Sequence, residues 1–431
     1  MKFLILTQYF PPEVGASQVR LAALCEELAR AGHQVEVVTA MPHHPVGEIF
    51  PSYRGKWYQR EERDSMVIHR VWLYAGKRSS AARLLSYLSF AVTCLYGLFR
   101  ANKPDYVFVD SPPLFLGIPG WIAAKCWRSC FVFNVADLWP DSARDLNIIR
   151  GRFLLGSATL LERWIYSRAN YVTAVTDGIR NTLLRDKQLP PGRVLFLPNG
   201  VDTHLFQPGA PDESLKQALG LTGKRVVLYA GNHGYAGAVE QLLRAASDLR
   251  GDPSIHFLLV GDGPEKKLLQ QLAVDLHLEN ITFHTSVSIE DLPPLLSISD
   301  LAAVTLRKAK ITEGARPAKM FVMMAGAKPI VLAAEGEAPI LLKTANAGTV
   351  VPPEDPVQLA GAIRALLNDP QRAKQLGANG RAFVKANFEW SSLVRGWLAQ
   401  LMAGKAPLQS VPRQTDKLRQ PEETGEAGVG A

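Results

Sequence analysis

The feature that most constrains this 431-residue sequence is an alternation of buried-type strands and amphipathic helices that occurs twice. The first series begins with the apolar run KFLIL at residues 2–6, followed by apolar residues at helical spacing over 17–32 and the strand pattern QVEVVT at 34–39. Its later strand patterns cover residues 105–110, 130–135, 170–176 and 193–198. Such alternation is typical of a doubly wound α/β sheet with parallel strands.

The alternation restarts after a Pro- and Gly-rich connection at residues 199–214. The strand patterns of this second series cover residues 225–231, 255–263, 280–284, 300–306 and 328–333. A chain of this length also exceeds the usual size of a single hydrophobic core. We therefore expect two Rossmann-like, doubly wound parallel-sheet domains that face a cleft. The expected limits are 1–205 and 206–390, then a C-terminal helix at 391–402 and a disordered tail at 403–431.

The formal net charge of +8 lies almost wholly in the first half of the chain. Lys and Arg number 23 against 16 Asp and Glu over residues 1–190, and 25 against 24 over the remainder. A basic half suits anionic lipid, a phosphorylated substrate or nucleic acid. Nucleic acid is not expected, because no compact Lys/Arg stripe with interleaved aromatic residues is found. The four cysteines form no C-x-x-C pair, which favours a reduced, cytosolic compartment without zinc or disulfides.

One apolar segment departs from the alternation. Sixteen residues without a charge, LLSYLSFAVTCLYGLF at 84–99, lie between Arg83 and Arg100. A bilayer span needs about 20 apolar residues, so the segment is short for one. Two interpretations stay open: a buried core helix, or a helix that lies in a membrane interface with basic residues at both ends.

Three loops have the composition of a nucleoside-diphosphate site. The first follows residues 2–6 and contains Gly15 and Ala16 ahead of Ser17, a candidate helix N-cap. The second, YAGNHGYAG, brings Gly231, Asn232 and Gly234 between a strand and a helix, and the third, VGDG, brings Gly261, Asp262 and Gly263. Each glycine alone is also explained as a turn former. Three such loops in two sheets favour phosphate binding.

Several motifs succeed one another as in glycosyltransferase family 4: YFPPEVGASQVRL, DLWPDS, PNGVDTHLFQP, YAGNHGYAGAVEQLL and PAKMFVMMAGAKPIVLAAEGEAPILL. Over about residues 1–400 the chain most resembles the branch that adds sugars to lipid-linked precursors of surface polysaccharides, such as the fucosamine transferases. The resemblance implies a GT-B arrangement with an acceptor-binding N-terminal domain and a C-terminal domain that binds the nucleotide-sugar donor. It also implies retention of anomeric configuration and no metal or other cofactor.

The helix expected from Pro317 has two basic residues at its start, Arg316 and Lys319, where the helix dipole is already positive. It resembles the family's donor-binding helix, so both are expected to face the donor diphosphate; the alternative is that they are solvated surface residues. Where the family has a ribose-binding carboxylate, this chain has Val322. Glu335 and Glu337 lie near the carboxyl end of the next strand, and one of them is expected to cover part of that role. Glu337 matches the family's G-E pair; the alternative for it is to cap its own helix.

Asp137, in FNVADLWPDS, follows a strand of the first series and is expected to act as the catalytic residue. In a front-side retaining displacement it would orient sugar and acceptor or stabilise the oxocarbenium-like state. The alternative is a capping role for the helix that follows. His43 and His44 have no partners at metal-ligand spacing and are interpreted as acceptor-loop residues or as part of a structural turn.

Taken with the resemblance, these patterns predict a retaining glycosyltransferase of cell-envelope or surface-polysaccharide synthesis. It would transfer a sugar from a nucleoside-diphosphate donor to a lipid-linked acceptor, and it would lie in the cytoplasm, peripherally on the anionic inner face of the membrane. Two alternatives remain: a catalytically weak relative that binds a nucleotide sugar or a partner enzyme, for which Val322 is the motive, and a nucleotide-sugar epimerase on the same architecture.

Overall fold

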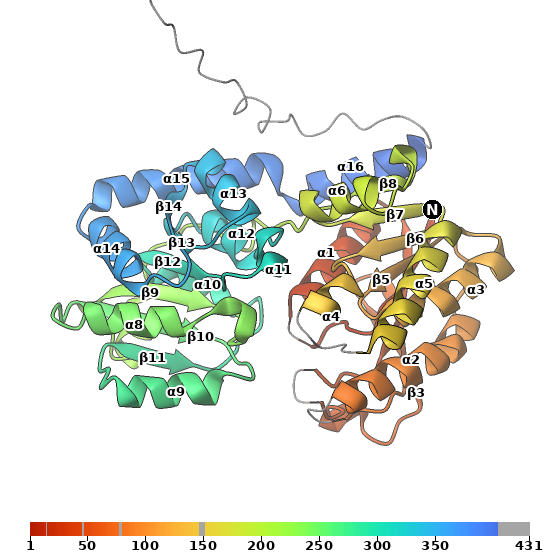
Figure 1. Ribbon diagram of the computed structural model, residues 1–431, viewed down its shortest axis with the longest axis horizontal. Helices are drawn as coiled ribbons and strands as arrows, with labels where there is room; N and C mark the ends of the chain where they lie inside the picture. Colours follow the sequence, from red (N-terminus) through yellow and green to blue (C-terminus); the bar gives the residue numbers. More distant parts are fainter. Residues whose placement is uncertain (14, 45–46, 77–79, 146–150, 404–431) are drawn as a thin grey trace, which may run out of the picture.

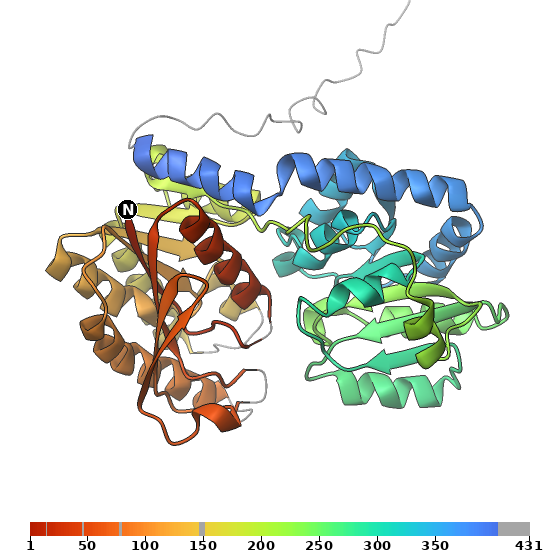
Figure 2. The same cartoon turned by 180° about the vertical axis from the view of Figure 1, so that it is seen from behind.

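The computed structural model contains two α/β domains side by side, each built on its own sheet (Figure 1). It describes residues 1–13, 15–44, 47–76, 80–145 and 151–403. Helices cover both faces of each sheet, and a pair of C-terminal helices runs along one side of the molecule, across both domains (Figure 2). The prediction of two doubly wound domains with mainly parallel sheets is confirmed.

The N-terminal sheet has eight strands in the order β3-β4-β2-β1-β5-β6-β7-β8, and all neighbouring pairs except β3-β4 are parallel. Its strands are β1 (Lys2–Leu6), β2 (Gln34–Ala40), β3 (Tyr58–Arg63), β4 (Met66–Val71), β5 (Tyr106–Ser111), β6 (Cys130–Val135), β7 (Tyr171–Ala174) and β8 (Val194–Phe196). The helices of this domain are α1 (Ala16–Arg30), α2 (Ser80–Arg100), α3 (Gly117–Trp127), α4 (Asp141–Asp145), α5 (Arg152–Arg168) and α6 (Asp177–Arg185).

The C-terminal sheet has six parallel strands in the order β11-β10-β9-β12-β13-β14. Its strands are β9 (Arg225–Ala230), β10 (Ile255–Val260), β11 (Ile281–His284), β12 (Leu301–Thr305), β13 (Ile330–Ala333) and β14 (Gly348–Val351). The helices are α7 (Glu213–Ala218), α8 (Glu240–Asp248), α9 (Lys266–Asp275), α10 (Leu292–Ser297), α11 (Lys310–Glu313), α12 (Ala318–Ala325), α13 (Glu337–Ala345), α14 (Pro356–Leu367) and α15 (Pro370–Asn387).

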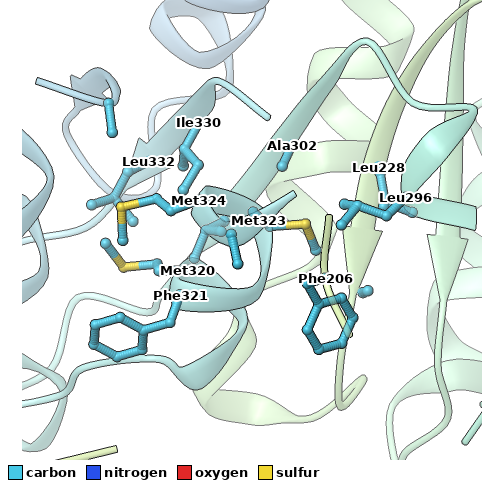
Figure 3. Close-up of a cluster of buried hydrophobic side chains, with 14 of the residues drawn as sticks. Phe206, Leu228, Leu296, Ala302, Met320, Phe321, Met323, Met324, Ile330 and Leu332 are labelled. Carbon is cyan, nitrogen blue, oxygen red and sulfur yellow. The ribbon is translucent and has the colours of Figure 1, made fainter. Parts of the chain in front are cut away.

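Helix α12 is fixed by an apolar face packed into the core of the C-terminal domain. Met320, Phe321, Met323 and Met324 are fully buried against the sheet strands and the segment that carries Phe206 (Figure 3). Their spacing covers more than one side of the helix, so α12 has little freedom to rotate. The first turn of α12, which carries Lys319, is therefore held in a fixed direction relative to the sheet.

The last helix, α16 (Trp390–Ala403), returns to the N-terminal domain and packs on α1 and β8 (Figure 2). Trp397 is fully buried there, with its ring centroid 5.6 Å from that of Phe108, and its indole N–H donates to Thr173 Oγ1 at 3.3 Å. The expected limits at 205/206 and 390/391 remain predictions, and the predicted tail lies outside the described residues except for Ala403, the last residue of α16.

Two features were missed from the sequence. Strands β3 and β4 form a hairpin whose two loop residues, Asp64 and Ser65, both have positive φ, as in a type I′ turn. Strand β3 is an edge strand with a polar sequence, so it gave no apolar signal. Strand β14 completes the second sheet with four residues, too few for a pattern.

Helix α2 has one buried and one exposed apolar face. Phe90, Cys94 and Leu98 are buried in the N-terminal core, whereas the other face exposes Leu84, Leu85, Leu88, Val92, Leu95 and Phe99. A wholly buried core helix is therefore not what is observed. The helix is also longer than the uncharged stretch, because its 21 residues extend to about 32 Å. In the described part of the chain, α2 is long and apolar enough to cross a membrane by length and composition.

We predict that Trp397→Ala lowers the free energy of unfolding by about 3–5 kcal/mol, because it empties a fully buried aromatic site between α16 and the N-terminal sheet. Urea denaturation followed by circular dichroism measures the change. Trp57→Ala, at a side chain that is 55% exposed, is the matched control and should cost much less. Equal effects of the two substitutions would contradict the structural role of α16.

Candidate functional site

The two glycine-rich loops that follow β9 and β10 interlock at the carboxyl edge of the second sheet. Gly261 has φ +147°, and a Cβ at this position would lie 2.0 Å from the carbonyl oxygen of Gly231. The backbone N–H of His233 donates to the carbonyl of Asp262 at 2.9 Å, which ties the loops together. Glycine is therefore required for contact between the loops, beyond its use in a turn.

The polar residues of these loops lie against the same contact. A Cβ on Gly263 would meet Asn232 Oδ1 at 2.3 Å, and one on Gly234 would lie 3.3 Å from the same atom. The carboxylate of Asp262 accepts the backbone N–H of Gly263 at 2.8 Å. The fold thus brings together most of the predicted donor-binding residues of the C-terminal domain: Gly231, Asn232, Gly234, Gly261, Asp262, Gly263 and Lys319.

Lys319, in the first turn of α12, reaches the wall formed by Gly231. A Cβ on Gly231, whose φ is +151°, would lie 2.8 Å from Lys319 Nζ, so a side chain at this position would displace the ammonium. The ammonium also lies 3.9 Å from the centroid of the Tyr229 ring, a cation–π contact.

The ammonium of Lys319 is poorly compensated. Within the residues that the structure describes, no carboxylate forms an ion pair with it, and burial lowers its pKa to about 7. The side chain is densely surrounded, yet it keeps partial solvent exposure. An anion that approached Gly231 would therefore meet a cation for which no carboxylate competes among the described residues.

Two further residues of this cluster were missed from the sequence. His233 is fully buried, and neither ring nitrogen has a hydrogen-bond partner among the described residues. Burial, together with Lys266 and Lys319, lowers its pKa to about 4, so the ring is neutral. Lys266 Nζ donates to the carbonyls of Gly261 at 2.7 Å and His284 at 3.1 Å, which holds the second loop in place. The available signal was a histidine inside a run of glycines.

Arg316 and Glu337 lie elsewhere, at the junction between the two domains. The Arg316 guanidinium donates to Glu337 Oε2 at 2.7 Å and to the carboxylate of Asp177, at the start of α6. Glu337 Oε1 in turn accepts the backbone N–H of Gly178. The N-cap of α13 is Gly336, so a capping role of Glu337 for its own helix is wrong. The predicted donor contacts of both residues stay predictions.

Asp137 follows β6 in the N-terminal domain and is half-buried. Its carboxylate accepts a hydrogen bond from the hydroxyl of Ser142, and burial raises its pKa above the ordinary aspartate value. Helix α4 begins at Asp141, so Asp137 is not its N-cap. The predicted catalytic role is untested by these contacts.

His43 and His44 belong to a cluster organised by Glu13, which is almost fully buried. Glu13 Oε1 accepts the backbone N–H of both histidines at 2.8 Å, and the Tyr9 ring contacts both imidazoles. Burial raises the pKa of Glu13 to about 7 and lowers that of His43 to about 4. Although His43 Nδ1 lies 3.3 Å from Glu13, both shifts favour neutral groups, and the ring nitrogen is closer to the Met41 carbonyl, at 3.0 Å.

The first glycine loop differs from expectation. The N-cap of α1 is Gly15, not Ser17, whose hydroxyl instead donates to Asp110 at 2.9 Å. Arg20 and Asp110 form a buried ion pair at 2.6 Å beneath this loop, a pair that the sequence analysis missed. The side chain of Ala16 lies outside the described part of the structure. Among the described residues, no group of three or more His, Cys, Asp or Glu could hold a metal ion.

Comparison with protein families gives two matches that together span most of the chain. Residues 15–200 match the family described as Glycosyl transferase 4-like domain, and residues 211–383 match Glycosyl transferases group 1.

Two relatives are similar over most of their length. The GDP-mannose-dependent alpha-(1-6)-phosphatidylinositol monomannoside mannosyltransferase of Mycolicibacterium smegmatis is 30% identical over 429 residues, covering 93% of this chain and 98% of the relative. The putative colanic acid biosynthesis glycosyl transferase WcaI of Escherichia coli K12 is 29% identical over 383 residues, covering 86% and 93%.

Solved structures show the same fold. Sucrose-phosphate synthase from Thermosynechococcus elongatus superposes with a TM-score of 0.72 at 20% identity, covering 93% of this chain and 98% of that one. Anabaena HepE, solved in complex with UDP and glucose, gives 0.70 at 19% identity, covering 94% and 100%. The expected GT-B fold is confirmed.

We predict that the affinity for a nucleoside-diphosphate sugar falls as pH rises above 7. Below the pKa of about 7 the free Lys319 already carries its proton, whereas above it every bound diphosphate must be accompanied by proton uptake. The loss should approach about tenfold per pH unit. Isothermal titration between pH 6.5 and 8.5 measures it. Lys319→Met should bind weakly at all these pH values; a variant with the wild-type profile would contradict the assignment.

Proposed function

The chain belongs to glycosyltransferase family 4, and from this premise we propose that it is a retaining enzyme that moves a sugar from a nucleoside-diphosphate donor to a lipid-linked glycan acceptor. The two families matched and the named relatives are glycosyltransferases. The donor, the acceptor and the stereochemical outcome are the proposed parts.

The observation that carries the proposal is the ammonium of Lys319 against the glycine wall. A diphosphate needs backbone room for its oxygens and a positive charge that is not already neutralised by protein. Gly231 supplies the room, and Lys319 has no ion-pair partner among the described residues. The start of α12, a buried helix, adds its dipole. HepE was solved with UDP, a ligand of this chemical class.

In the proposed reaction the leaving diphosphate is stabilised by Lys319 as the glycosidic bond breaks, and the same phosphate takes the acceptor's proton. No resident metal is part of the proposal, because Lys319 supplies the charge. Asp137 orients the sugar and the acceptor hydroxyl from the N-terminal domain. Its raised pKa and its bond to Ser142 are consistent with a held, partly desolvated carboxyl group.

A lipid-linked acceptor is supported by the link between α2 and the Tyr9/Glu13/His43/His44 cluster. Gln8 Nε2 donates to Ser86 Oγ of α2 at 3.2 Å, directly beside this cluster in the chain. Helix α2 has Arg83 near one end and Arg100 at the other, and both residues are exposed. A helix that lay on the inner membrane face through this side would bring the cluster to the lipid surface. Lys77 and Arg78, also expected to contribute, lie outside the described residues.

Val322 favours a second candidate, a relative that binds a nucleotide sugar or a partner enzyme without efficient transfer. Its apolar side chain is only partly buried and packs against the C-terminal core, so it offers no hydrogen-bond acceptor to a ribose. No observation specifically favours the other alternative, a nucleotide-sugar epimerase.

Donor hydrolysis over a panel of UDP-, GDP- and dTDP-sugars tests the function. The proposal predicts slow hydrolysis of one donor class, unaffected by EDTA, with retention at the anomeric carbon by NMR. Lys319→Met should lose at least about tenfold in kcat/KM, because a charge-assisted contact contributes about 1.5–3 kcal/mol. Binding without hydrolysis of any donor favours the second candidate, and no binding at all contradicts both.

For the membrane we predict that Val92→Asp weakens co-sedimentation with anionic liposomes. Val92 is 68% exposed at the middle of the apolar face of α2, where a carboxylate would be forced toward lipid. Val274→Asp, at an equally exposed valine of α9 in the other domain, is the matched control and should bind like the wild type. High salt and Arg83→Glu with Lys103→Glu should also weaken binding. A wild-type protein that stays in the supernatant would contradict the proposal.

A further inference from the structure

Two residues predicted to bind the donor, Arg316 at its diphosphate and Glu337 at its ribose, join the two domains in this structure. Arg316, just before α12, and Glu337, the first residue of α13, come from the C-terminal domain; Asp177 and Gly178 start α6 in the N-terminal domain. Arg316 bridges the carboxylates of Asp177 and Glu337, and Glu337 accepts the N–H of Gly178. We call this group the junction clamp.

The close approach at the junction clamp depends on glycine. A Cβ on Gly178 would lie 2.6 Å from Glu337 Oε1 and 3.5 Å from the Cα of Gly314. Gly336, with φ +86°, allows the segment before α13 to lie on Glu313, whose carbonyl oxygen would be 2.0 Å from a Cβ. The approach of Gly178 to Gly314 brings backbone of the two domains close together, a contact that surface ion pairs alone do not require.

The charges of the clamp residues and the burial of Arg316 favour this contact between the domains. The Arg316 side chain is 12% exposed and has a carboxylate on each side, while the Glu337 carboxylate lies at the N-terminus of α6, where the helix dipole favours a negative charge. The N-cap of α6 is Thr176, whose hydroxyl satisfies Ile179 N–H, so the Gly178 N–H is left for Glu337.

The junction clamp lies close in the chain to Lys319 in one domain, and its other half leaves the sheet beside Asp137 in the other domain. Arg316 lies three residues before Lys319, just outside α12. Asp177 follows β7, which pairs with β6, and the register sets Ala174 opposite Val135, so Asp177 and Asp137 leave neighbouring strands at the same edge. A change of angle between the domains would thus move Lys319 relative to Asp137.

We propose that the junction clamp fixes the angle between the domains and so positions the donor side of the site against Asp137, with Asp177 and Glu337 as positioning residues. The consequence for transfer rests on the proposed function, whereas the domain angle does not. The competing interpretation is that Arg316 is a diphosphate ligand and its carboxylate contacts are incidental.

Small-angle scattering of the ligand-free protein tests the domain angle without any substrate. The radius of gyration of a compact chain of this length is about 22 Å, and release of the clamp should raise the measured value by about 1 Å through hinge opening. Asp177→Asn and Gly178→Ala should both open the molecule. Asp186→Asn, an exposed aspartate at the other end of α6, and Gly156→Ala, where a Cβ meets nothing within 4 Å, are the matched controls.

Gly178→Ala keeps every charge and places alanine in a helix, so it separates the clamp from the loss of an acidic residue at the α6 N-terminus. Asp177→Glu should restore the wild-type radius. If both test variants scatter like the wild type while remaining folded by circular dichroism, the clamp does not set the angle and the proposal is overturned. If Asp177→Asn unfolds, the radius of gyration of Gly178→Ala alone decides whether the clamp sets the domain angle.

Donor binding distinguishes the two interpretations of Arg316. If the closed state binds the donor, opening should weaken binding by roughly threefold for a fall in the closed fraction to about a third, in Asp177→Asn and Gly178→Ala alike. If Arg316 is solely a phosphate ligand, only Arg316→Gln weakens binding and the radius stays unchanged in all variants, which overturns the proposal. A larger radius in a protein that binds no donor would support the clamp and contradict the proposed function.

Discussion

The arrangement of the site depends on how α12 is buried. Four large apolar residues, Met320, Phe321, Met323 and Met324, fix the helix in the C-terminal core, and this fixes the direction of Lys319 in its first turn. Gly231 leaves no side chain in front of the ammonium, and Gly261 lets the second loop lie against Gly231. An unpaired cation is costly to hold in such surroundings, and its pKa of about 7 reflects that cost. An anionic ligand that bound there would relieve it.

Residues that lie close in the chain were predictable from the sequence. Gly231 and Gly261 follow apolar strand patterns, so the carboxyl-edge rule for parallel sheets already put their loops together. Lys319 stood out because a basic residue at a helix start is unfavourable without an anion. The apolar strands themselves were evident because both faces of a parallel sheet are covered by helices.

Contacts between distant segments were not predictable. The partners of Arg316 and Glu337 in the N-terminal domain are 139 and 159 residues away, and no local pattern encodes them. The buried pair of Arg20 and Asp110 combines a helix residue and a strand residue that each look ordinary alone. Strand β3 was not predicted for another reason. An edge strand exposed to water needs no apolar alternation, so the sequence of β3 lacks the usual strand pattern. The turn that follows it, with positive φ at Asp64, is its one distinctive feature.

The central claim is that the ammonium of Lys319 receives the donor diphosphate. A crystal structure of the protein with a bound nucleoside diphosphate tests this directly. The account predicts a phosphate oxygen within about 3 Å of Lys319 Nζ, the range of charge-assisted hydrogen bonds, with the diphosphate over Gly231. A diphosphate held by other side chains, with Lys319 still against the Tyr229 ring and no phosphate contact, would contradict it.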